Sequence, residues 1–170
     1  RRALALKPDD AQILSNLGNA LWRIGQSDEA LEAGRRAVAL APESDVAHNN
    51  LGLILVSRGE RVEAAECLMR AVKLNPGYTE AWSSLGDALR DEGARREALA
   101  CYTRAVELDP RRADGHCKLG DILFDMRRVK EAMASYERAL TAEPRHAPTH
   151  AALVVALRHL GRPDEAEASC

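Results

Sequence analysis

The sequence predicts an all-α solenoid of two-helix repeats, because three kinds of residue recur every 34 positions along its 170 residues. Small residues form two of these columns, namely Gly18, Gly52, Gly86 and Gly120, and Ala30, Ala64, Ala98, Ala132 and Ala166. Leucine recurs at Leu17, Leu51, Leu85, Leu119 and Leu153, and proline at Pro8, Pro42, Pro76, Pro110 and Pro144. A period of 34 residues is the length of a helix–turn–helix unit whose neighbours stack.

The period divides the chain into repeats when Ala11 is taken as the first position. Full repeats then occupy residues 11–44, 45–78, 79–112 and 113–146. Residues 1–10 end a preceding repeat, and residues 147–170 begin a further one. We expect all of them to form a single solenoid domain.

Each repeat is expected to hold a first helix (A) and a second helix (B). The A helices are predicted at 11–24, 45–58, 79–92, 113–126 and 147–160, and the B helices at 28–40, 62–74, 96–108 and 130–142. Leu14, Leu17 and Leu21 give the first A helix an apolar stripe. Proline ends each B helix, because it lacks an N–H and disfavours helix in the preceding residue. Asp10, Ser44 and Ser27 are predicted N-caps, since their side chains can accept from free N–H groups.

A second glycine column, Gly25, Gly59, Gly93 and Gly161, marks the turn between A and B. Glycine at this point permits the left-handed backbone that commonly ends a helix. Arg127 stands in the column in the fourth repeat. That turn is therefore expected to use another geometry or to be strained. The small residues of the repeat columns are expected to let the A and B helices approach closely.

Composition excludes several classes of function. The net charge of −2 argues against a nucleic-acid-binding protein, which usually carries a strong basic excess. The four cysteines form no C-x-x-C pair, so we expect reduced, packed thiols and no metal or cofactor. The chain shows no phosphate loop, nucleophile set or paired-carboxylate pocket, so we expect no enzyme activity. Arginine strongly outnumbers lysine, which is typical of a GC-rich bacterial genome.

The sequence also gives expectations about location. No apolar run approaches the ~20 residues that cross a bilayer, and no signal-peptide pattern is present. We therefore expect a cytoplasmic protein without a membrane partner. The chain opens inside a repeat and without Met, so we expect it to be a fragment of a longer protein.

The third repeat carries a recognisable pattern of large, small and turn residues. Its members are Trp82, Leu85, Gly86, Leu89, Ala98, Tyr102, Ala105 and Pro110. This pattern resembles the tetratricopeptide repeat, and the resemblance covers essentially the whole chain. It implies a right-handed superhelix, with A helices lining a concave groove, that acts as a non-catalytic scaffold binding proteins or peptides. The first repeat departs from the pattern at Gly34 and the fifth at Val154.

The early repeats also resemble those of O-GlcNAc transferases and related bacterial tetratricopeptide proteins, through the stretches Asn16–Leu21 and His48–Gly52. In that family, inward-facing asparagines hold the backbone of an extended peptide, and Asn16 and Asn50 match their position. This leaves open a substrate-recruiting arm of a larger enzyme. A carboxylate clamp of the chaperone-binding type is not expected, because Ser15, Glu80 and Ser84 stand where basic residues are required.

The family resemblance selects the residues expected to contact a peptide in the groove. They are Asn16, Asn19, Trp22, Asn49, Asn50, Leu53, Ser84, Asp87, Asp91, Lys118, Asp121 and Asp125. The set begins with amides and becomes acidic. We hypothesise that the groove prefers a peptide with basic residues toward the fourth repeat. The alternative is a solvated helix face with local Arg–Asp pairs.

Three histidines, His48, His116 and His150, share one repeat position. A metal site is one interpretation, but repeat-related side chains start about a helix-pair width apart, while zinc needs ligands at ~2 Å. We interpret them as packing residues. Self-assembly through the open ends of the solenoid is a further alternative. RNA binding is a distant one, since an acidic groove disfavours it.

Overall fold

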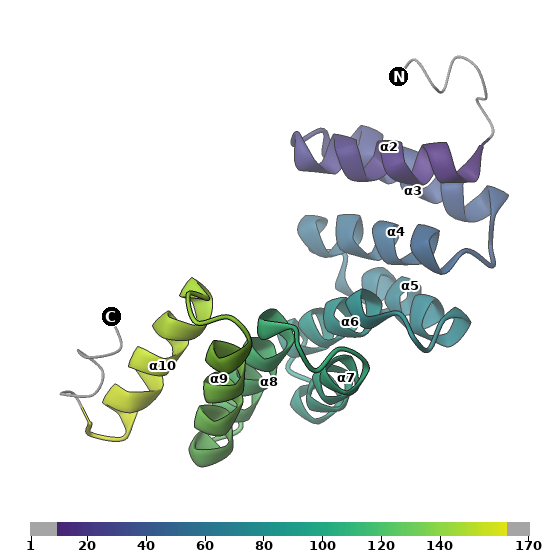
Figure 1. The fold of residues 1–170 in the computed structure, drawn as a ribbon. Coiled ribbons are helices and arrows are strands. Elements are labelled where there is room, and N and C mark those ends of the chain that lie inside the picture. The colour runs from purple at the N-terminus through teal and green to yellow at the C-terminus, as the bar shows by residue number, and fades with distance from the viewer. Residues whose placement is uncertain (1–9, 163–170) are drawn as a thin grey trace. The chain divides into compact units, whose positions relative to one another are not determined.

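The computed structural model describes residues 10–162, and these form nine α-helices without a strand (Figure 1). The A helices are α2 (Ala11–Arg23), α4 (Asp45–Arg58), α6 (Thr79–Asp91), α8 (Ala113–Asp125) and α10 (Ala147–His159). The B helices are α3 (Ser27–Leu40), α5 (Arg61–Leu74), α7 (Arg95–Leu108) and α9 (Val129–Ala142). The predicted all-α architecture is confirmed, and each helix begins and ends within one residue of its predicted range. Pro8, Ala166 and Cys170 lie outside the described residues.

The chain divides into two compact units, unit 1 (Arg1–Ala88) and unit 2 (Leu89–Cys170), and the division falls within α6. Each unit is described by itself. The expectation that the whole chain forms a single solenoid domain stays a prediction.

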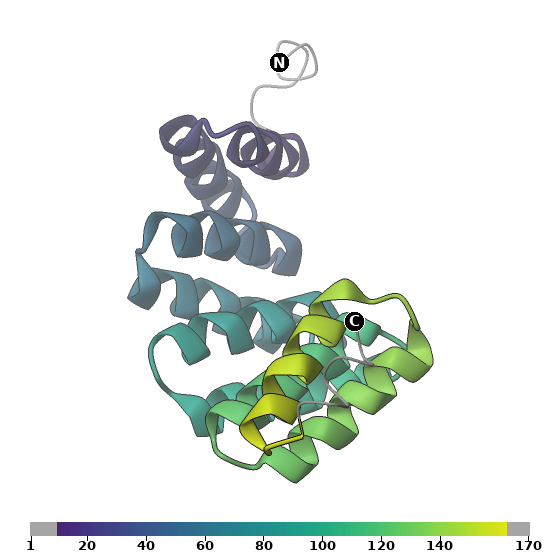
Figure 2. The ribbon, with the colours of Figure 1, turned by 90° about the vertical axis from the view of Figure 1, so that its left-hand side faces the viewer.

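Unit 1 is built from stacked helix pairs. Helix α2 packs against both α3 and α4, and α4 packs against α5 (Figures 1 and 2). Leu14 and Leu21 of α2 are buried, as are Ile54 and Leu55 of α4 and Leu68 of α5. Each helix therefore buries an apolar stripe against its own repeat partner and against the next repeat, as expected for a solenoid without a central core.

Unit 2 repeats this arrangement with larger side chains. Helix α8 packs against α7, α9 and α10, and α9 also contacts α10 (Figure 2). One apolar cluster joins Tyr102 of α7 to Ile122 of α8, and another joins Leu123 to Tyr136 of α9. Both tyrosines are at most 2% exposed. Unit 2 therefore uses the same small-residue packing as unit 1 and in addition buries two aromatic rings of its own.

The repeat glycines lie where A and B helices meet closely. A methyl group added at Gly52 would lie 2.6 Å from Cγ of Leu68, and one added at Gly120 would overlap the ring of Tyr136. At Gly18 the nearest atom would be the carbonyl oxygen of Ala30, at 3.2 Å. The predicted packing role of these columns is confirmed at all three positions, because a side chain would have to displace a neighbouring group.

The helix ends follow most of the predicted rules. Asp10 accepts hydrogen bonds from the N–H groups of Gln12 and Ile13, and Ser44 accepts one from Ala47, so both predicted N-caps are confirmed. Ser27 is instead the first residue of α3, and the N-cap is Gln26, so that prediction was wrong. Arg127 adopts the left-handed conformation of the turn glycines, with φ of 62°, which is the strained alternative.

Candidate functional site

The predicted groove residues of unit 1 include two buried amides. Asn49 is 4% exposed and Asn50 is 9% exposed. Asn50 Nδ2 donates to Oγ of Ser15, at 2.9 Å, and thereby joins α4 to α2. Because Ser15 is itself only 3% exposed, this is a buried polar pair between two A helices. The Asn50 amide, which was expected to bind a peptide backbone, therefore donates a hydrogen bond to a neighbouring helix instead.

Asn49 has a less complete set of partners. Its Nδ2 donates to the hydroxyl of Tyr78 at 3.4 Å, a long contact, and its Oδ1 is buried without a hydrogen-bond partner. Burial of the Tyr78 ring and the nearby carboxylate of Glu80 raise the pKa of the tyrosine. A buried, unpaired carbonyl oxygen costs about 1–3 kcal/mol, so Asn49 is a weak point of this packing.

Six further members of the predicted set lie on the A helices of unit 1. Asn16 is exposed and accepts a 3.4 Å hydrogen bond from Gln12, and Ser84 donates to the backbone carbonyl of Glu80 at 2.9 Å. The other four are half-buried, namely Asn19, Trp22, Leu53 and Asp87. Trp22 packs against the cluster that contains Leu21 and Ile54.

Unit 2 holds an acidic cluster, which we define as Asp121 and Asp125 of α8 with the guanidinium of Arg90 between them. Arg90 Nε donates to Oδ2 of Asp125 at 2.7 Å, and its Nη1 lies 3.7 Å from Oδ2 of Asp121. Tyr136 donates from its hydroxyl to Oδ1 of Asp121 at 2.9 Å. Asp121 is thus fixed from two sides, whereas Asp125 is paired with Arg90 and lies at the exposed end of α8.

Burial governs the electrostatics of this cluster. Desolvation raises the pKa of Asp121 above its ordinary value, although the hydrogen bond from Tyr136 and the charge of Arg90 oppose the shift. Desolvation and the charge of Asp121 raise the pKa of Tyr136 in turn, so the tyrosine stays a donor. Of the two remaining predicted residues, Lys118 lies 3.8 Å from Asp114, and its charge also opposes the rise in the pKa of Asp121. Asp91 is exposed.

The histidine position has a role that sequence reasoning missed. His48, His116 and His150 each place Nε2 2.9 Å from the carbonyl oxygen of the repeat proline six residues earlier. Trp82 occupies the same repeat position and donates from Nε1 to Pro76 at 3.0 Å. Since a carbonyl only accepts, the histidines must carry the proton on Nε2. The presence of a tryptophan in the same column was the signal that a ring N–H donor is required.

Other candidate chemistry is limited. Among residues 10–162, no group of three His, Cys, Asp or Glu side chains could hold a metal ion, and no helix is long and apolar enough to span a membrane. Burial raises the pKa of Cys67 and Cys101 to about 11. The hollows lined by His116 and Arg138, by Leu119 and Glu131, and by Leu14 and Arg36 include none of the predicted groove residues.

Comparison with known families gives matches along most of the chain. Residues 1–45 and 123–169 match models described as tetratricopeptide repeat, and residues 86–126 match one described as TPR repeat. Residues 35–99 match a model of the Est1 DNA/RNA binding domain. No curated protein is significantly similar in sequence.

Solved structures of similar fold include several repeat proteins. The chain is 26% identical to TTC0263, a thermophilic TPR protein of Thermus thermophilus, with a TM-score of 0.80 over 92% of this chain and 86% of that one. MamA is 25% identical, with a TM-score of 0.76 over 86% of this chain and 85% of that one. YrrB, described as a TPR protein with an unusual peptide-binding site, is 21% identical, with a TM-score of 0.76 over 99% of this chain and 87% of that one.

The helix pairs, the 34-residue columns and these matches lead to one assignment. No comparison tests the special likeness to O-GlcNAc transferases, which stays a prediction. The chain belongs to the tetratricopeptide repeat family.

Proposed function

We propose that the chain is a non-catalytic protein-binding scaffold whose A-helix face in unit 2 binds a basic peptide segment. The observation that carries this proposal is Arg90, whose guanidinium lies between Asp121 and Asp125. A cluster that accommodates one guanidinium has the charge and spacing to interact with another. Membership of a repeat family with a peptide-binding structural neighbour supports the general class of function.

The exposed carboxylates decide where a partner would contact the cluster. Asp121 is held by both Tyr136 and Arg90, whereas Asp125 pairs with Arg90 alone. Asp125 and the exposed Asp91 at the end of α6 are therefore the carboxylates that a partner could engage with the smallest loss of internal contacts. A lysine or arginine of the partner would share Asp125 with Arg90 or displace it. Such partly exposed ion pairs contribute little energy singly and are screened by salt, so they would select and orient a partner rather than supply most of its affinity.

The proposal can be tested with two variants that differ only in the position of the lost charge. Asp125→Asn removes the carboxylate of the cluster that pairs with Arg90 alone, and Glu137→Gln removes an exposed carboxylate of α9 as a matched control. Fluorescence anisotropy with a labelled arginine-rich peptide is expected to show weaker binding for Asp125→Asn alone, with a steep decrease as NaCl rises. Equal binding by both variants and the unaltered chain would contradict the proposal.

Three narrower hypotheses remain predictions. A substrate-recruiting arm would require a glycosyltransferase domain in the same gene product. Self-association through the repeat ends would make the light-scattering mass rise with protein concentration. The expected absence of nucleic-acid binding can be measured directly with an oligonucleotide, which is of interest because of the match of residues 35–99 to the Est1 domain.

A further inference from the structure

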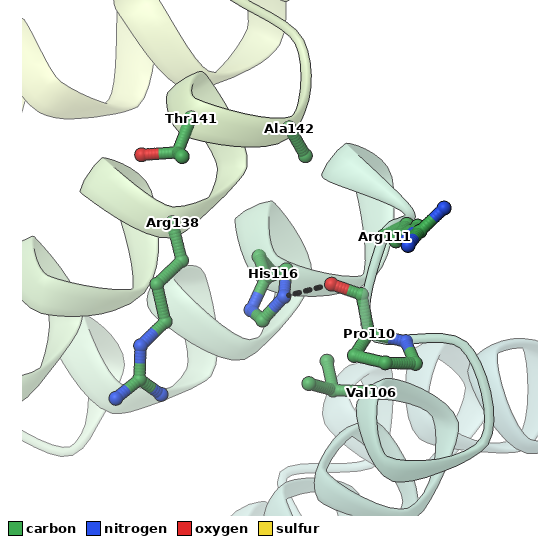
Figure 3. Close-up of a pocket in the computed structure, with 7 residues that line it drawn as sticks. All are labelled: Val106, Pro110, Arg111, His116, Arg138, Thr141 and Ala142. Carbon is green, nitrogen blue, oxygen red and sulfur yellow. Dashed lines mark hydrogen bonds between the residues drawn. The ribbon is translucent and has the colours of Figure 1, made fainter.

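A hollow of about 670 Å³ lies in unit 2, beside the helices α7, α8 and α9 (Figure 3). Val106 of α7, Pro110 of the following turn and Ala142 of α9 supply apolar surface. The ring of His116, which is 5% exposed, forms part of the wall and is held by the Pro110 carbonyl. None of these residues belongs to the predicted groove, so the hollow is a separate surface formed largely by the B helices and a connecting turn.

Two arginines flank the hollow. Figure 3 shows Arg111 beside Pro110 and Arg138 on α9, on opposite sides of His116. Both residues are exposed, and neither guanidinium has an ion pair or hydrogen bond within residues 10–162. The remaining lining residue, Thr141, donates its hydroxyl to the carbonyl of Glu137. The lining therefore contains two positive charges and no carboxylate.

No ion pair within residues 10–162 joins either arginine to the acidic residues nearest to it in sequence. Glu107 is paired with Arg104 at 3.0 Å, the Asp109 carboxylate accepts from the backbone N–H of Arg111, and Glu137, next to Arg138, is exposed. An apolar hollow with a free guanidinium on either side complements a ligand that has an apolar centre and negative charge at both ends.

The equivalent place in unit 1 shows that this charge arrangement is specific to unit 2. Two periods of 34 relate Arg111 to Glu43 and Arg138 to Arg70 of unit 1, whereas one period relates them to Gly77 and Arg104. Glu43 and Arg70 form an ion pair of 2.6 Å. In unit 2 the loop glutamate is replaced by arginine, so an internal ion pair becomes two unpaired cations. Repeat packing alone does not require this reversal of charge.

We propose that the Arg111–Arg138 hollow binds an acidic peptide segment of a partner protein, with an aliphatic side chain in the hollow and carboxylates at the two arginines. The peptide class is favoured over nucleic acid, because the chain carries a net charge of −2 and lacks the extended basic surface that phosphate backbones require. This proposal is independent of the basic-peptide surface on α8, since the two share no residue.

The test uses the full 170-residue chain and a fluorescein-labelled peptide with one leucine flanked on each side by two glutamates. Arg111→Glu restores the charge pair found between Glu43 and Arg70, so it should leave the melting temperature unchanged or raise it. It is expected to weaken peptide binding at least ~10-fold, and Arg111→Ala ~3-fold or more. Arg95→Glu makes the same charge change at an exposed position outside the hollow and should alter binding less than ~2-fold.

Further probes separate the alternatives. Replacing the peptide leucine by glycine should weaken binding, and a peptide with lysines in place of the glutamates should not bind. The proposal is overturned if Arg111→Glu and Arg95→Glu reduce binding equally, or if the unaltered chain does not bind the glutamate peptide. It is also overturned if a short single-stranded oligonucleotide binds in an Arg111-dependent manner and the peptide does not.

Discussion

The A helices of the two units use polar side chains in opposite ways. In unit 1, Asn50 is buried and its amide joins α4 to α2 through Ser15. In unit 2, the corresponding helix face carries Asp121 and Asp125, which share Arg90 near the surface. A neutral amide can be buried at small cost when it is paired, whereas carboxylates lose much more solvation and so stay close to water. The same helix face can therefore stabilise the fold in one repeat and remain accessible in another.

The largest expected effect compares the close helix contacts of the two units. Gly120→Ala should destabilise the chain by ~2–3 kcal/mol, because the added methyl overlaps the buried Tyr136 ring, which the Asp121 hydrogen bond also fixes. Gly52→Ala should cost less, ~1–2 kcal/mol, because the added methyl approaches Leu68 less closely than the Tyr136 ring and no hydrogen bond fixes the leucine. Urea denaturation followed by circular dichroism measures both. Equal losses would show that the tyrosine is no more rigid than the leucine.

A second comparison separates buried from exposed amides. Asn50→Ala leaves the Ser15 hydroxyl without its partner in a buried place, so the free energy of unfolding should fall by ~1–3 kcal/mol. Asn16→Ala should change it by less than ~0.5 kcal/mol, because Asn16 is exposed and its contact with Gln12 is 3.4 Å long. If the two substitutions had the same effect, the Asn50–Ser15 pair would not be a stabilising contact.

The turns provide a smaller contrast. Arg127 has φ of 62°, whereas the glycines Gly25 and Gly59 occupy the corresponding turns of unit 1. Arg127→Gly should stabilise the chain by ~0.5–1 kcal/mol, because a left-handed non-glycine residue costs about 1–2 kcal/mol and the exposed contact to His159 returns little. Thermal melts of Arg127→Gly and Arg127→Ala test this. A lower melting temperature for the glycine variant would mean that the His159 contact outweighs the strain.

The smallest expected effect is a change of folding stability with pH that arises from Asp121 in unit 2. Burial raises the pKa of Asp121 in the folded chain above its ordinary value of 3.8. Between these two pKa values the folded state therefore binds the proton more tightly than the unfolded state does. Stability should consequently fall as pH rises through the window between those two pKa values, and it should recover as pH is lowered again. Asp121→Asn should remove this component. An unchanged pH profile of stability in that variant would assign the dependence to other groups.

The sequence predicted the helices and their bounds well, but it predicted the burial and contacts of individual polar side chains poorly. Helix bounds followed from proline, glycine and leucine spacing, since these residues act through the local backbone and helix packing. The burial of Asn50 could not be predicted, because it depends on Ser15, 35 residues earlier. The Arg111–Arg138 hollow was missed for a similar reason, as free space among three helices has no sequence signature. Its charge reversal relative to Glu43 was visible in the repeat alignment.

The hydrogen bond from the shared ring position to the repeat proline has a consequence for repeat engineering. His48, His116 and His150 perform the same task as Trp82, although the two residue types differ greatly in size and polarity. What these rings have in common is one N–H group directed at the proline carbonyl before the A helix. Modules carrying either ring should therefore be exchangeable between arrays, and a designer could choose histidine to leave room beside the turn or tryptophan to fill it.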